Sequence, residues 1–164
     1  METPPSGIPS VQPAAGWPTS FVELYRASYD PMVRLAYLLV GSQSLAEEVV
    51  QEAFVRIRGH LDRVEHPGAY LRSTVVNLAR NQLRRRALER DVAARARPEA
   101  SVDEVDELSD ALAALPYRQR AVLVLRYYQD CSEAEIASIL GCRPGTVKSL
   151  ASRGLSALRG VLAS

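Results

Sequence analysis

The segment that most constrains the fold lies near the C-terminus, between Ser132 and Leu158. Ser132, followed three residues later by Glu135, has the pattern of a capping box, which begins a helix by satisfying free backbone amides. Gly141 can adopt the left-handed conformation that ends a helix, and Pro144 suits the first turn of the next one. The pattern therefore predicts two short helices joined by a tight turn.

The second of these helices is expected to be amphipathic. Apolar residues recur at helical spacing along one face, namely Val147, Ala151, Leu155, Leu158 and Leu162. The opposite face is basic and rich in hydroxyl groups, with Thr146, Lys148, Ser149, Ser152, Arg153 and Arg159. This is the helix-turn-helix pattern of DNA-binding proteins. A helical hairpin packed in some other domain has the same apolar pattern, but the basic face favours DNA.

The charge distribution supports nucleic-acid binding more than the net charge does. The chain carries a net charge of only +1. Residues 67–98 hold eight Arg against two acids, residues 99–110 hold six acids and no base, and residues 111–164 hold seven bases against three acids. Two basic blocks are thus separated by an acidic one, and their sum conceals both.

The first part of the chain is predicted to be helical after a disordered start. Residues 1–20 hold five prolines and no periodic pattern, which indicates a disordered tail. Pro31 interrupts the first helical pattern, as a kink or as the start of a new helix. Ser44 and Glu47 form a second capping-box pattern. The helical patterns cover about residues 21–41, 44–61 and 69–95.

The third of these helices leaves a polar face outward. Its arginines have few acids to pair with, and asparagines lie between them, so the composition suits phosphate and base contact better than a merely solvated charge run. The outward residues are Arg72, Asn77, Arg80, Asn81, Arg84 and Arg85.

The second part of the chain contains a linker and a further helical cluster. Residues 97–107 are acidic and lack core periodicity, so they are expected to form a flexible linker. A strongly apolar helix is expected over Tyr117–Tyr128. No segment has the pattern of a strand. The predicted fold is therefore all-α, with two small helical domains at residues 21–96 and 108–164, the second a helix-turn-helix (winged-helix-like) DNA-binding domain.

Several classes of protein have no support in the sequence. There is no phosphate-binding glycine loop, no nucleophile–base arrangement and no carboxylate pair with metal spacing. Cys131 and Cys142 are expected to be small buried hydrophobic residues, and His60 and His66 have no zinc spacing. Neither catalytic residues, nor a metal, nor a cofactor is predicted. The absence of a long apolar run and of a signal-peptide pattern predicts a cytoplasmic protein without membrane insertion.

Three segments, taken together, resemble the sigma-70-type RNA polymerase sigma factors of the compact extracytoplasmic-function (ECF) group. Residues 46–56, AEEVVQEAFVR, are similar to the helix that binds the core enzyme. Residues 70–81 and the arginines after them resemble the promoter-melting and minus-ten segment. Residues 115–122, 132–137 and 145–149 resemble the minus-thirty-five domain.

The resemblance implies a non-enzymatic protein that directs RNA polymerase to promoters. Its partners would be core RNA polymerase and promoter DNA, with an anti-sigma factor as a further possible partner and no small-molecule substrate. Core polymerase would be bound by Glu48, Gln51, Glu52 and Phe54. The minus-ten element would be bound by Tyr70, Asn77, Arg80, Asn81, Arg84 and Arg85. The minus-thirty-five element would be bound by Arg143, Thr146, Lys148, Ser149, Ser152 and Arg153.

Two residues depart from the family pattern. A Ser or Thr commonly stands at the position of Arg143, which cannot cap a helix in the same way, and losing such a cap costs roughly 1 kcal/mol. An Arg commonly stands at the position of Leu150, which here extends the apolar stripe. Two alternatives stay open: a stand-alone helix-turn-helix transcriptional regulator that dimerises through its N-terminal helices, and an adaptor that sequesters polymerase without starting transcription.

Overall fold

The computed structural model describes residues 19–93 and 106–164 and is helical throughout that part of the chain. Because no strand occurs in it, the all-α prediction is confirmed there, and no β-wing accompanies the helix-turn-helix. The predicted tail up to residue 18 and most of the predicted linker lie outside the described residues. The elements are α1 Thr19–Val40, α2 Gln43–Arg58, η1 Leu61–Arg63, α3 Pro67–Ala93, α4 Glu107–Ala113, α5 Tyr117–Leu123, η2 Val124–Tyr128, α6 Glu133–Leu140 and α7 Pro144–Ala163.

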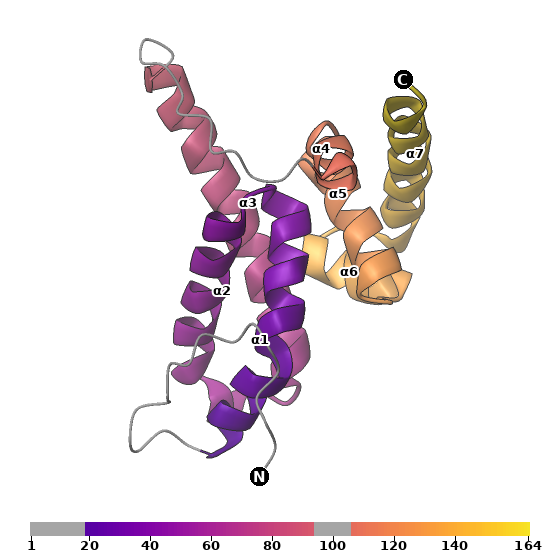
Figure 1. Cartoon of the computed structure of the whole chain (residues 1–164). Helices are drawn as coiled ribbons and strands as arrows, with labels where there is room; N and C mark the ends of the chain where they lie inside the picture. The colour runs from indigo at the N-terminus through magenta and orange to yellow at the C-terminus, as the bar shows by residue number, and fades with distance from the viewer. Residues whose placement is uncertain (1–18, 94–105) are drawn as a thin grey trace.

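The first three long helices, α1, α2 and α3, pack against one another as the N-terminal domain (Figure 1). Pro31 lies inside α1 on an exposed position, so it does not start a new helix. The cap predicted at Ser44 is wrong. Ser42 is the N-cap of α2, because its backbone is extended and its Oγ accepts from the Leu45 amide at 3.3 Å.

The C-terminal domain consists of α4 to α7. The helix expected over Tyr117–Tyr128 is in fact two, because the backbone widens into the π-helix η2 after Leu123. Gly154 allows α7 to approach α5 closely: a Cβ at this position would lie 3.2 Å from the Leu123 side chain. This close approach explains a glycine in the interior of a helix, where it otherwise costs stability.

The two domains touch each other. Figure 1 shows α4 and α5 beside the C-terminal end of α1, and α1 contacts α4, α5 and η2. Buried residues from both domains, among them Leu39, Leu112 and Leu125, form one continuous hydrophobic core. The part of the chain that the structure describes is therefore two helical units joined by a packed interface.

Candidate nucleic-acid and partner-protein interfaces

The helix-turn-helix has the local structure that its sequence predicts. Ser132 Oγ accepts from the Glu135 amide at 3.1 Å, and Glu135 Oε2 accepts from the Ser132 amide at 3.3 Å, so the capping box is confirmed. Gly141 ends α6 in the left-handed conformation, with φ 64°. Arg143 is the N-cap of α7 and makes no side-chain capping bond. The turn that presents α7 is therefore fixed mainly by α6.

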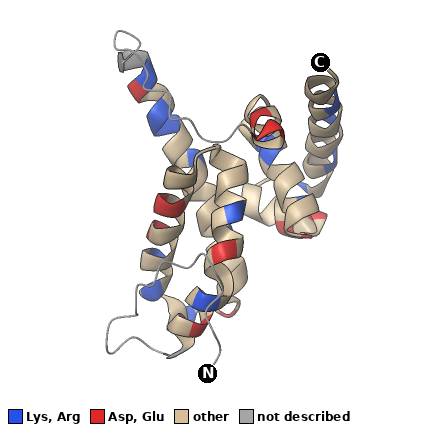
Figure 2. Cartoon of the chain, in the orientation of Figure 1, with Lys and Arg blue, Asp and Glu red and all other residues tan. Residues whose placement is uncertain are grey.

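One side of α7 packs inward and the other is open to solvent. Leu150 is buried, so it belongs to the core rather than to the polar face. Thr146 is half-buried. The exposed members of the predicted minus-thirty-five set are Arg143, Lys148, Ser149, Ser152 and Arg153. Figure 2 shows basic residues along α7. This face carries positive charge with hydroxyl groups between, a composition that suits a DNA backbone.

Two exposed side chains of α7 are held by local contacts. Lys148 Nζ lies 3.8 Å from Glu133 Oε2 on α6, and Arg153 Nε donates to the Ser149 carbonyl at 3.3 Å. The Lys148 pair is largely exposed, so its contribution to stability is small and it is easily exchanged for a phosphate. These contacts orient the Lys148 and Arg153 side chains and leave both accessible to solvent.

A second basic face follows α3. Tyr70, Asn77, Asn81 and Arg84 are exposed and recur at spacings of seven, four and three residues, which places them along one side of the helix. Arg85 is also exposed. Figure 2 shows basic residues gathered on the end of α3 that projects beyond the other helices. Arg80 differs from this group because it is half-buried and its charge acts on Tyr117 of the C-terminal domain.

The outer face of α2 is acidic and polar. Glu48 and Gln51 are exposed, and the Glu52 carboxylate accepts from Arg56 at 2.9 Å. Burial raises the pKa of Tyr29 of α1, and the nearby Gln51 side chain acts on this pKa in the opposite direction. Gln51 remains accessible to solvent.

Phe54 differs from the other predicted docking residues because it does not lie on this exposed face. It is 3% exposed and packs in an aromatic cluster with Phe21, Tyr25 and Tyr29. Val55, which sequence reasoning missed, is 70% exposed. It follows Gln51 by four residues, so helical spacing alone could have placed it beside Gln51. The accessible face of α2 is therefore Glu48, Gln51, Glu52 and Val55.

Other kinds of site have little support in residues 19–93 and 106–164. No group of three or more His, Cys, Asp or Glu side chains there could hold a metal ion. No helix within these ranges is long and apolar enough to cross a bilayer.

Two domain families of RNA polymerase sigma factors match this chain. Sigma-70 region 2 matches residues 24–89, and Sigma-70, region 4, matches residues 106–158. The chain is 37% identical over 161 residues to the RNA polymerase sigma-E factor of Streptomyces avermitilis, covering 92% of this chain and 89% of that protein. It is 36% identical over 154 residues to the ECF RNA polymerase sigma factor SigL of Mycobacterium tuberculosis, covering 83% and 87%.

A solved structure has a similar fold. It is the sigma factor RpoE of Bartonella quintana, crystallised in complex with the anti-sigma factor NepR, with a TM-score of 0.75 and 24% sequence identity over 88% of this chain and 97% of that one. The two domain matches account for α1 to α3 and for α4 to α7 in the expected order. The chain therefore belongs to the ECF group of sigma-70-type RNA polymerase sigma factors.

Proposed function

We propose how this sigma factor divides its work between the two domains. Domain 2, residues 21–96, would bind core polymerase through Glu48, Gln51, Glu52 and Val55 and would hold the minus-ten element on α3. Domain 4, residues 108–164, would lay α7 against the minus-thirty-five element. The observation that supports this division is the separation of three accessible faces: an acidic one on α2 and two basic ones on α3 and α7.

On α3, the proposed minus-ten residues are Tyr70, Asn77, Asn81, Arg84 and Arg85, with Arg80 at the edge of the domain interface. The ring of Tyr70 can stack on an unpaired base, and stacking is worth about 1–3 kcal/mol per base. The asparagines can bond base edges, while the arginines neutralise phosphates. On α7, the proposed minus-thirty-five residues are Arg143, Thr146, Lys148, Ser149, Ser152 and Arg153.

Two further assignments belong to the proposal. An anti-sigma factor would bind this chain, as NepR binds the similar RpoE of Bartonella quintana. The protein would act in the cytoplasm, because polymerase and promoter DNA are its partners there.

Run-off transcription with core polymerase tests the function. Adding the purified chain to core enzyme should give a promoter-dependent transcript, and replacing Asn77 and Asn81 together with Ala should reduce the transcript more than it reduces holoenzyme assembly. Equal losses in both assays would mean that the face on α3 is not a DNA surface. A gel shift of promoter DNA with the purified chain alone, at physiological salt, tests the alternative of a stand-alone transcriptional regulator. That alternative requires tight DNA binding without polymerase.

A further inference from the structure

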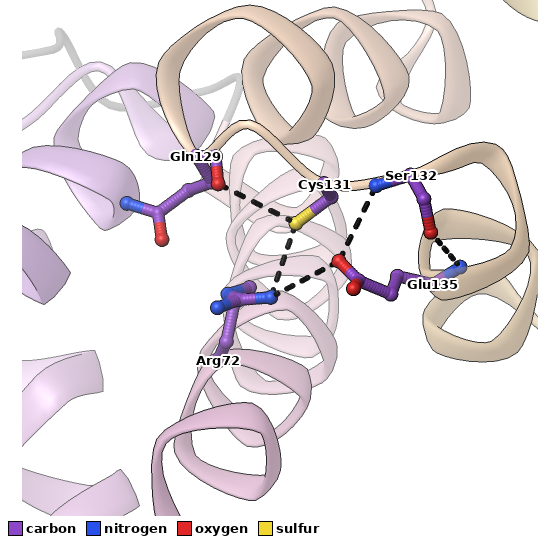
Figure 3. A network of polar contacts seen from close by, with 5 residues as sticks. All are labelled: Arg72, Gln129, Cys131, Ser132 and Glu135. Carbon is purple, nitrogen blue, oxygen red and sulfur yellow. Dashed lines mark hydrogen bonds and ion pairs between the residues drawn. The ribbon is translucent and has the colours of Figure 1, made fainter.

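The two glutamates in the first turn of α6 have different partners. Figure 3 shows that Glu135 completes the capping box: its Oε2 accepts from the Ser132 amide and lies 3.8 Å from Nη1 of Arg72 on α3. Nη1 of the same arginine lies 3.1 Å from Cys131 Sγ. Glu133 precedes Glu135 by two residues, so it lies on a different side of α6. Its partners come from η2 and α7 instead.

The Glu133 carboxylate holds two cations, one on each oxygen. Nη1 of Arg126 on η2 lies 3.4 Å from Oε1, and Nζ of Lys148 on α7 lies 3.8 Å from Oε2. The Arg126 guanidinium also lies 5.9 Å from the ring centre of Tyr127, which is 59% exposed. Among the residues that the structure describes, neither Arg126 nor Lys148 pairs with a second acid. One carboxylate therefore gathers both cations at the edge of the exposed face of α7.

The two ion pairs are partly open to water. The exposed fractions of the side chains are 40% for Arg126, 33% for Glu133 and 69% for Lys148. Ion pairs with this exposure are weak, because water and salt screen them. An anion from outside the protein can therefore replace the carboxylate at small cost. Arg126 precedes the helix-turn-helix in an otherwise apolar stretch, so only the fold brings its charge beside that of Lys148.

A DNA phosphate offers a cation the same groups as the Glu133 carboxylate does. Each phosphodiester carries one negative charge on two terminal oxygens, so two cations that converge on a carboxylate can bind a phosphate in its place. Glu133 stays close after such an exchange, because it belongs to the first turn of α6. The Debye length is about 8 Å at physiological ionic strength, so salt screens the carboxylate from a neighbouring phosphate only in part. The carboxylate therefore repels the phosphate that replaces it.

We propose that Arg126 and Lys148 form a phosphate-binding site at the edge of the minus-thirty-five face, and that Glu133 is a built-in competitor that weakens this site. The inference rests on the proposed function of α7 as a DNA-binding helix. Phosphate contacts carry no sequence information. The competitor therefore lowers the affinity for promoter and non-promoter duplexes by the same factor, and it limits how long the protein stays on DNA that lacks the right bases.

Glu133→Gln tests the competitor, because it removes the charge and keeps the size of the side chain. Holoenzyme assembled from core polymerase and this variant should bind a promoter duplex about three-fold more tightly than wild-type holoenzyme, the effect of one unit charge at about 6 Å in water. A duplex of unrelated sequence should gain by the same factor. The slope of log affinity against log salt concentration should steepen by about one, because one more counterion is released.

Three further variants complete the experiment. Glu107→Gln is the matched control, because it removes the same charge from an exposed glutamate of α4, outside the helix-turn-helix, and should bind DNA as the wild type does. Glu133→Asp keeps the competing charge and should also bind as the wild type does. Arg126→Gln tests the phosphate site: it should weaken binding to both duplexes and should reduce the salt slope by about one, as the loss of a phosphate contact does.

Unchanged or weaker DNA binding by folded Glu133→Gln would overturn the competitor, since the glutamate would then only position the two cations. Tighter binding by Glu133→Asp would overturn it as well, because the charge would not be the cause. Wild-type affinity in Arg126→Gln would overturn the phosphate site. A failure of the proposed function would appear separately: wild-type holoenzyme would then give no promoter-dependent run-off transcript.

Discussion

Arg143 occupies a position where its side chain does nothing for its helix. It is the N-cap of α7, with φ −81° and ψ 152°, and makes no capping bond. A serine fits this extended backbone and can accept from the amide of Gly145 or Thr146. We expect Arg143→Ser to stabilise the protein by about 1 kcal/mol, which raises the melting temperature by about 2–4 °C. Thermal unfolding followed by circular dichroism measures the change.

Arg143→Ala separates the effect of losing the positive charge from the effect of gaining a helix cap. It removes the same positive charge without supplying a cap, so it should weaken minus-thirty-five binding as much as Arg143→Ser does, and should give no rise in melting temperature. If both variants melt alike, the missing cap does not limit the stability of this domain.

At the scale of the helix, α2 has an exposed face and a buried face, and substitutions on the two faces should have different effects. Gln51→Ala should reduce the pull-down of core polymerase and leave the melting temperature nearly unchanged, since Gln51 is exposed. Phe54→Ala should lower the unfolding free energy by about 3–5 kcal/mol, because it empties the centre of an aromatic cluster. Thermal melts and pull-downs on the same preparations measure both effects.

Val55→Ser tests whether the exposed Val55 takes part in binding polymerase. It exchanges an exposed apolar side chain for a small polar one, so binding should fall while the fold is retained. If Phe54→Ala keeps wild-type stability but loses polymerase, the docking role of Phe54 stands after all. If Val55→Ser binds normally, Val55 does not belong to the face.

Elements with local chemical signals were the predictable ones. The Ser132–Glu135 box and Gly141 act within a few residues of themselves, and the structure confirms them. The same signal misplaced the start of α2, because Ser44 has a glutamate three residues later, whereas the actual N-cap, Ser42, is followed at that distance by Leu45. The π-helix after Leu123 was missed, since a single wider turn leaves the apolar pattern unchanged.

At the scale of the whole molecule, the sequence could predict the two domains but not their packing. Charge blocks and helical periodicity are local patterns of the sequence, and they indicate where each domain begins and ends. The interface depends instead on Tyr117 and Arg120 reaching backbone carbonyls 41 and 81 residues away. A carbonyl acceptor exists at every residue, so no side-chain pattern marks the ones that are used. Family resemblance supplies the function of each domain and is silent on this contact.

The shared core has a thermodynamic consequence for the full chain. A domain of about 55 residues is marginal alone, and here its core is continuous with that of the other domain. We expect calorimetry of the full chain to give one transition, with the van't Hoff enthalpy equal to the calorimetric enthalpy. Tyr117→Phe combined with Arg72→Gln should split the transition in two or lower the ratio of the van't Hoff enthalpy to the calorimetric enthalpy. Tyr127→Phe should leave the transition unchanged. Two resolved transitions in the wild-type protein would mean that the domains unfold independently, and that the interface is too weak to couple their stabilities.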